Sequence, residues 1–207
     1  HKQKRLYLLI DKFTEFDLHP DKIDNHQMGS VYEELLRKFS EMSNEESGDH
    51  FTPRDVVKLL VSFVFGGDRE NLQGEGKIRS VFDPCCGTGG MFVQSIKFIE
   101  SHQGTKKEVS IYGQENTPTT YKLAKMNIAI RGISANLGKK HADTFADDQH
   151  KDLKADYIMA NPPFNQKEWR NENELIDDPR WNGYSVPQSS NANYAWILNM
   201  VSKLSDN

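Results

Sequence analysis

Apolar side chains in the first part of the chain recur at helical spacing. In the opening segment these positions lie three and four residues apart, at Leu6, Leu9, Ile10 and Phe13. A second helix is predicted around Ser30 and Glu33, which have the spacing of a capping box, with an apolar face of Val31, Leu35 and Phe39. Both periodicities are typical of amphipathic helices that bury one face.

A third helix is predicted after the polar segment 40–49. Thr52 is placed to cap it, Pro53 falls at its first position, where a missing N–H is tolerated, and Asp55 closes a capping box. The inward positions are Val56, Val57, Leu60, Val61 and Val64. We therefore expect a helical region over residues 1–50, followed by a larger domain over residues 51–207.

From Lys77 the pattern changes to short apolar runs that alternate with helical segments. Strands are expected at 78–82, 109–113, more weakly at 137–142, and at 155–160, with helices at 91–99, 118–131 and 194–204. Such alternation predicts right-handed β-α-β crossovers and a parallel sheet. The expected fold class is therefore α/β, and each turn that follows a strand should lie at one edge of the sheet.

Composition narrows the class of protein. Lys and Arg total 26 against 30 Asp and Glu, a net charge of −4, so a nucleic-acid substrate would need a local basic patch or a partner protein. The two cysteines, Cys85 and Cys86, are adjacent, which disfavours a disulfide or a zinc site and indicates a reducing compartment. With no membrane-length apolar run and no signal-peptide pattern, we expect a cytoplasmic protein without a metal. Both ends lie inside helical patterns, so a longer parent protein is expected.

The turn after the first predicted strand has the chemistry of a cofactor loop. Asp83 stands at the strand tip, and Gly87, Gly89 and Gly90 allow close backbone approach and positive φ angles before the next helix. A dinucleotide site would have G-x-G-x-x-G here. An acid ahead of G-x-G-G suits a ligand with a cationic amino-acid portion better than one with phosphates. A purely structural glycine turn is the alternative.

Two further acids follow predicted strands. Glu115 comes after the second strand, where an acidic residue in nucleotide-binding sheets accepts hydrogen bonds from ribose hydroxyls. Asp143 comes after the third strand and could accept from an adenine amino group. For each of them a solvated loop carboxylate is the alternative.

The turn after the last predicted strand, Asn161-Pro162-Pro163-Phe164, is suited to gripping a planar amino group. The Asn161 side-chain carbonyl and the Pro162 carbonyl can converge on one NH₂, and neither proline offers a competing N–H. Phe164 supplies a stacking face. The polar segment that follows is long for a compact domain and is therefore expected to be functional or mobile. A structural Pro-Pro turn is the alternative.

These motifs resemble those of a known family. The chain is similar to S-adenosylmethionine-dependent methyltransferases that act on N6 of adenine in DNA, in Asp83-Pro84-Cys85-Cys86-Gly87-Thr88-Gly89-Gly90-Met91-Phe92 and Asn161-Pro162-Pro163-Phe164. More narrowly, it resembles the modification subunit of type I restriction-modification systems, in Gly29-Ser30-Val31-Tyr32-Glu33-Glu34-Leu35-Leu36-Arg37-Lys38-Phe39 and His50-Phe51-Thr52-Pro53-Arg54-Asp55-Val56-Val57. The resemblance covers the chain from about Gly29 onward.

The resemblance implies a Rossmann-like methyltransferase sheet that is incomplete at its carboxyl end, with residues 51–207 as a truncated catalytic domain. It implies S-adenosylmethionine as cofactor, bound by Phe51, Thr52, Pro53, Asp83, Gly87, Thr88, Gly89, Gly90, Glu115, Asp143 and Phe145. In this assignment Glu115 takes the ribose, and Asp143 and Phe145 take the adenine. The implied catalytic residues are Asn161, Pro162, Pro163 and Phe164.

The resemblance also implies partners: DNA, a DNA specificity subunit and a restriction endonuclease subunit. Two other functions stay open. One is methylation of a protein glutamine amide or of an RNA guanine, because those enzymes share the Asn-Pro-Pro turn. The other is a scaffold that binds cofactor or partner without turnover. The helical lead and the segment 50–57 favour the DNA methyltransferase.

Overall fold

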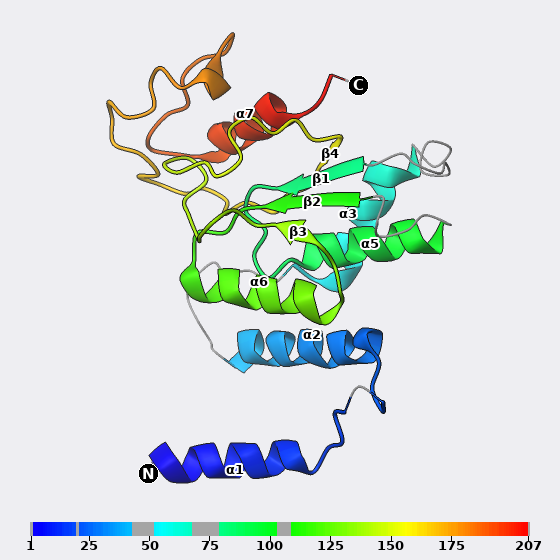
Figure 1. Cartoon of the computed structure of the whole chain (residues 1–207). Coiled ribbons are helices and arrows are strands. Elements are labelled where there is room, and N and C mark those ends of the chain that lie inside the picture. Colours follow the sequence, from blue (N-terminus) through cyan, green and yellow to red (C-terminus); the bar gives the residue numbers. More distant parts are fainter. Residues whose placement is uncertain (1, 20, 43–51, 68–78, 103–108, 207) are drawn as a thin grey trace.

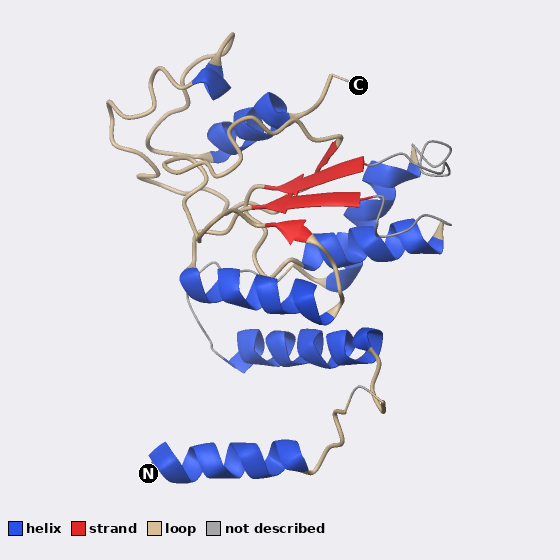
Figure 2. Cartoon of the chain, viewed as in Figure 1, coloured by secondary structure: helices blue, strands red, loops and turns tan. Residues whose placement is uncertain are grey.

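A computed structural model of the chain describes residues 2–19, 21–42, 52–67, 79–102 and 109–206. Its helices are α1 (Lys2–Thr14), α2 (Asn25–Met42), α3 (Arg54–Gly66), α5 (Gly90–Ser101), α6 (Pro118–Ile130) and α7 (Asn193–Lys203), with a short 3₁₀ helix, η2 (Pro179–Trp181). Its strands are β1 (Arg79–Asp83), β2 (Val109–Gly113), β3 (Ala135–Asn136) and β4 (Tyr157–Ile158). Figure 1 and Figure 2 show these elements in sequence order and by type.

The described strands form one parallel sheet in the order β3-β2-β1-β4. Strands β1 and β2, which form its middle, pair from Arg79 with Val109 to Asp83 with Gly113. Because all the strands are parallel, their carboxyl ends meet at one edge, where open α/β sheets bind ligands. The α/β fold class predicted from the sequence is confirmed, and the turns after β1, β2 and β4 share that edge.

Side chains on the strands alternate between two packed faces. Val81 of β1 belongs to a core that includes buried residues of α3, α5 and α6, such as Phe65 and Phe92. Its neighbour Phe82 turns to the opposite face, where its ring meets the edge of His150. Figure 1 shows α3, α5 and α6 on one side of the sheet and α7 on the other.

A second core of aromatic side chains lies on the α7 side. It comprises Phe145, Trp169, Trp181, Ala192, Ala195, Trp196 and Leu198. Its rings pack with centroids 4.5–6.4 Å apart around Phe145. This cluster holds the long segment 165–192 against the sheet, so the segment is ordered by packing although it has little regular structure.

The amino-terminal helices differ in how they meet the rest of the molecule. Helix α2 packs on α6, where the Tyr32 hydroxyl donates to the carbonyl of Leu123 at 3.0 Å. In α1 the four apolar positions predicted to form one face are 47–59% exposed, so the described part of the chain does not bury them. The predicted domain border at residue 50 falls in residues 43–51, outside the described residues, and stays a prediction.

The predicted start of the second helix is wrong. Helix α2 begins at Asn25, and its capping box is formed by Asp24 and Gln27, whose side chains each accept from the other's backbone N–H at 3.1 and 2.7 Å. Ser30 lies inside the helix and donates to the carbonyl of His26 at 3.0 Å. The Asp-x-x-Gln pattern satisfies the same rule as Ser-x-x-Glu and comes earlier in the chain.

The predicted third strand is displaced in the structure. Strand β3 contains only Ala135 and Asn136, ahead of the predicted segment 137–142. The Asn136 side chain accepts from the N–H of Gly138 at 3.0 Å, and Gly138 has a φ of +78°. This turn bends the backbone away from the sheet. Among the described helices, none is both long and apolar enough to cross a membrane.

Candidate active site

The loop between β1 and α5 is a tight glycine turn with space beside its backbone. Gly87 and Gly89 have φ angles of +53° and +82°, which side-chain-bearing residues rarely adopt. A Cβ atom on Gly87 or Gly90 would meet no atom of the described residues within 4 Å, apart from its own neighbours along the chain. The loop therefore leaves open space against its backbone, as a cofactor that approaches closely requires. Thr88 contributes its carbonyl, which accepts from the Asn127 amide at 2.8 Å.

Asp83 lies at the tip of β1 and is buried, with 2% of its surface exposed. One carboxylate oxygen accepts from the N–H of Cys85 at 3.0 Å. Burial raises the pKa of Asp83 to about 7, and this hydrogen bond offsets the shift only in part. A desolvated carboxylate of this kind is a favourable partner for a cationic ligand group.

We expect the free energy of unfolding to fall as the pH rises from about 4 to about 7, owing to Asp83. Its folded pKa, about 7, lies above the unfolded value of about 3.9. Across this window the native state keeps a proton that the unfolded state has lost, so stability falls, and it levels off once the native carboxyl ionises.

Urea unfolding of the parent and of Asp83→Asn between pH 4 and 8 measures this contribution. The stability difference between the two proteins should change across the window, because the asparagine cannot ionise but can still accept from Cys85. Asp152→Asn is the matched control at an exposed site and should follow the parent. Parallel curves for the parent and Asp83→Asn would show that the carboxylate is not desolvated.

Glu115 joins the loops that follow β1 and β2. One carboxylate oxygen accepts from the N–H of Gly87 at 3.1 Å, and the other accepts from the N–H of Thr117 at 2.7 Å. Each oxygen of a carboxylate has two lone pairs, so a bond to a backbone N–H does not by itself preclude a second bond to a hydroxyl. The geometry is compatible with the predicted ribose contact and adds a structural role for Glu115 in shaping the glycine loop.

Asp143 and Phe145 lie in the loop after β3, beside the glycine loop. One Asp143 oxygen accepts from the N–H groups of Phe145 and Ala146 at 2.8 and 2.9 Å. The Thr144 hydroxyl donates to the carbonyl of Pro84 at 2.5 Å, which ties the two loops together. The Phe145 ring is 2% exposed within the aromatic cluster, so it supports the loop and has little surface left for a ligand. The adenine contacts of Asp143 and Phe145 stay predictions.

Gln114 is a site-supporting residue that the sequence analysis missed. Its fully buried amide donates to the carbonyls of Ala142 and Asp147 at 3.2 and 2.9 Å and accepts from the N–H of Gln149 at 3.0 Å. Gln114 thereby fixes the loop that carries Asp143. Its position directly after a predicted buried strand is the feature of the sequence that could have indicated this role.

The turn after β4 brings Asn161 to Thr52. The Asn161 side-chain N–H donates to the Thr52 hydroxyl at 2.9 Å. The amide is thereby oriented so that its oxygen is the group left to accept from a substrate. The predicted helix cap at Thr52 is wrong: Pro53 is the N-cap of α3 and no side chain caps it. Phe51 lies outside the described residues.

Phe164 and the residue after it complete the turn. The Phe164 side chain is 69% exposed, so its ring is available for stacking. Asn165 has a φ of +56°, and its N–H donates to the Asn193 side chain at 2.8 Å. The Asn165 side chain accepts from the amides of Asn191 and Asn193, both at 3.2 Å. The start of α7 therefore holds the turn from its carboxyl side, a contact that the sequence analysis did not anticipate.

The two halves of the site share the carboxyl edge of the sheet. The N–H of Met159, two residues before Asn161, donates to the carbonyl of Phe82 at 3.1 Å, next to Asp83. The arrangement combines an open glycine loop, a buried acid and an oriented amide with an exposed ring. Within the described ranges no group of three or more His, Cys, Asp or Glu side chains is placed to hold a metal ion.

Comparisons with known proteins agree with this geometry. The family model for N-6 DNA methylases matches residues 23–207. The type I restriction enzyme HindI methylase subunit of Haemophilus influenzae is 49% identical over 180 residues, which cover 87% of this chain and 38% of that protein. This chain therefore spans well under half the length of that relative.

Solved structures of methyltransferases match the fold of the chain. The methyltransferase subunit of a type I restriction-modification system from Streptococcus thermophilus matches with a TM-score of 0.72 and 25% identity, over 86% of this chain and 37% of that chain. A protein from Listeria monocytogenes that is named a putative class I S-adenosylmethionine-dependent methyltransferase matches with a TM-score of 0.70 and 17% identity. The match covers 99% of this chain and 58% of that chain. The likeness to the second protein concerns the fold alone.

Proposed function

Because the chain belongs to the N-6 DNA methylase family, we propose that it carries the part of a modification subunit that transfers a methyl group from S-adenosylmethionine to N6 of adenine in DNA. The observation that carries this proposal is the hydrogen bond from the Asn161 amide to Thr52, which leaves the Asn161 oxygen to accept from a substrate amine. This oxygen belongs to a turn at the same sheet edge as the glycine loop.

The residues of the glycine loop and its neighbours are proposed to hold the cofactor. Asp83 would pair with the cationic amino-acid portion, and Gly87, Thr88, Gly89 and Gly90 would lie against it. Glu115 would accept from the ribose, Asp143 from the adenine, and Thr52 and Pro53 would border the pocket. The space beside Gly87 and Gly90 supports this fit. When bound, S-adenosylmethionine supplies an electrophilic methyl group.

The turn residues are proposed to orient the target base. The Asn161 oxygen and the Pro162 carbonyl would accept both hydrogens of the adenine amino group, so that its lone pair points out of the ring plane. The exposed Phe164 ring would stack on the base, a contact worth about 1–3 kcal/mol. Alignment with the methyl donor supplies the larger share, about 7–11 kcal/mol, through proximity.

Duplex DNA as substrate implies that the target adenine leaves the base stack, because its amino nitrogen is otherwise paired. The net charge of −4 supports a requirement for partner proteins in DNA binding. We propose that these are the DNA specificity subunit and the restriction endonuclease subunit of a type I system, the class of enzyme to which the Haemophilus influenzae relative belongs. A cytoplasmic location fits this substrate and the free cysteines Cys85 and Cys86.

Transfer of a labelled methyl group tests the proposed function directly. The full-length protein with its specificity subunit should label N6 of adenine in duplex DNA and should leave RNA guanine and a glutamine peptide unlabelled. A duplex of only dG and dC is the matched control, because it offers no adenine. Label on the RNA or the peptide would identify one of the other substrates, and cofactor binding without any transfer would indicate a scaffold.

A further inference from the structure

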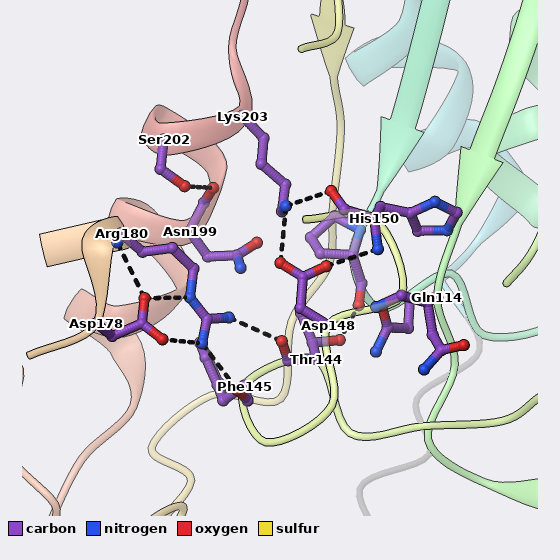
Figure 3. Close-up of polar contacts among 12 residues, drawn as sticks. Gln114, Thr144, Phe145, Asp148, His150, Asp178, Arg180, Asn199, Ser202 and Lys203 are labelled. Atoms are coloured by element: carbon purple, nitrogen blue, oxygen red, sulfur yellow. Dashed lines mark hydrogen bonds and ion pairs between the residues drawn. The ribbon is translucent and has the colours of Figure 1, made fainter. Parts of the chain in front are cut away.

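The segment after the Asn161–Phe164 turn contains a buried arginine whose donors reach a different part of the site. Arg180, in η2, is 9% exposed. Its guanidinium forms a two-pronged contact with Asp178 at 2.8 and 2.7 Å. It also donates to the backbone carbonyls of Thr144 and Phe145 at 2.8 and 2.7 Å. Figure 3 shows the guanidinium between Asp178 on one side and these two carbonyls on the other.

The two carbonyls belong to the loop that borders the proposed cofactor site. In that loop the Thr144 hydroxyl donates to the carbonyl of Pro84, which directly follows Asp83. Asp143, the proposed adenine acceptor, is the preceding residue and accepts from the N–H of Phe145. Arg180 is therefore connected to the cofactor side by two successive sets of hydrogen bonds. The first joins Arg180 to the carbonyls of Thr144 and Phe145, and the second joins Thr144 to Pro84.

The other end of this connection is the Asn161–Phe164 turn, which is proposed to orient the target base. Segment 165–192 begins directly after Phe164, and Asn165 is bonded to Asn193 at the start of α7. Packing restricts Arg180 within this segment, because its guanidinium lies 5.2 Å from the Trp181 ring centroid and 5.7 Å from that of Phe145. A shift of the segment on DNA binding would move the Thr144 and Phe145 carbonyls with it.

We propose that Arg180 is a positioning residue that couples the DNA side of the site to the cofactor side. The proposal rests on the proposed function. The planar guanidinium serves a carboxylate and two carbonyls at once, whereas a lysine ammonium can pair with Asp178 but cannot span both sets of acceptors in the same geometry. Coupling between two binding sites is reciprocal, so DNA should tighten cofactor binding by the same factor by which cofactor tightens DNA binding.

The experiment measures this factor as a ratio of two dissociation constants. Calorimetry on the full-length protein with its specificity subunit gives the dissociation constant of S-adenosylhomocysteine, the cofactor without its transferable methyl group. It is measured with and without a short duplex that the methyl-transfer assay shows to be a substrate. For the parent we expect at least about fivefold tighter cofactor binding with DNA, at the lower end of usual coupling factors. In Arg180→Lys the ratio should fall to near one.

Arg170→Lys is the matched control. Arg170 lies in the same segment and also stacks on a tryptophan, but its described bonds go only to carbonyls of that segment: Asn171, Glu172, Glu174 and Pro187. It therefore makes no direct bond to the cofactor side, and its variant should keep the parent ratio. A merely structural role for Arg180 would weaken cofactor binding equally with and without DNA, which leaves the ratio unchanged.

A second variant keeps the proposal falsifiable if Arg180→Lys does not fold. Thr144→Val removes the bond to the Pro84 carbonyl at the other end of the connection and should lower the ratio as well. A parent ratio of one, or parent-like ratios in the folded variants, would overturn the coupling alone. Absence of cofactor binding in the parent would overturn the proposed function together with the coupling.

Discussion

Asn161→Ala in the full-length protein should lower the rate of methyl transfer by about 10²–10³-fold, the usual loss when one preorganised polar contact to a reacting group is removed. The deleted oxygen is the group that the bond to Thr52 leaves to accept from the target amine. Cofactor affinity should stay unchanged, because Asn161 itself makes none of the proposed contacts with S-adenosylmethionine. Single-turnover transfer of labelled methyl to duplex DNA gives the rate, and calorimetry gives the affinity.

Two substitutions at Thr52 provide the control for this result. Thr52→Ser keeps the hydroxyl that orients the Asn161 amide and should keep most of the rate. Thr52→Val removes the acceptor while it keeps the shape, so the amide can turn and the rate should fall between those of the parent and Asn161→Ala. An Asn161→Ala protein as fast as the parent would mean that the Pro-Pro turn is only structural.

Lys203→Met should lower the free energy of unfolding by about 3–5 kcal/mol, the cost of removing one member of a buried ion pair. The Lys203 ammonium lies 2.8 Å from the Asp148 carboxylate and donates to the carbonyl of His150 at 2.7 Å, and both charged side chains are buried. Its loss leaves the Asp148 charge desolvated, with the backbone N–H of His150 as its described hydrogen-bond donor. Urea unfolding at neutral pH measures the change.

The exposed pair of Lys140 and Asp147 is the matched control for Lys203. It has a similar separation, 2.9 Å, but its side chains are 65% and 45% exposed. Lys140→Met should therefore change stability by only about 0–1 kcal/mol. In the double variant Lys203→Met with Asp148→Leu no charge is left buried, so part of the stability should return. Equal effects at Lys203 and Lys140 would show that burial does not strengthen the inner pair.

The architecture could be read from the sequence because local patterns determine most of it. Strand β2 has the bounds predicted for it, Val109–Gly113, since a short apolar run between turns has few other structures open to it. Strand β3 could not be placed, because its two residues become a strand only by pairing with Ile111 and Tyr112 of β2. A strand of two residues is too short to show a hydrophobic periodicity, and its distant pairing partner cannot be recognised in its own sequence.

The motif residues of the site were also predictable, but the groups that orient them were not. The sequence Thr52-Pro53-x-Asp55 has the spacing of a helix cap, whereas the Thr52 hydroxyl bonds to a side chain 109 residues away. Gln114 and Arg180 act mainly on backbone carbonyls, which every residue carries, so no pattern of residue types marks their partners. Such contacts become visible only when the fold has brought the loops together.

The packing of α2 against α6 means that residues before the predicted domain border at residue 50 support the proposed catalytic part. Glu33 of α2 pairs with Arg131 at 2.7 Å, and Arg131 in turn donates to the side chain of Asn127. The amide of Asn127 holds the carbonyl of Thr88 in the glycine loop. A shortened protein that starts at residue 51 would therefore lose more than a neighbouring helix. It would leave Arg131 without its buried carboxylate partner. The lost support would extend through Asn127 to the cofactor loop itself.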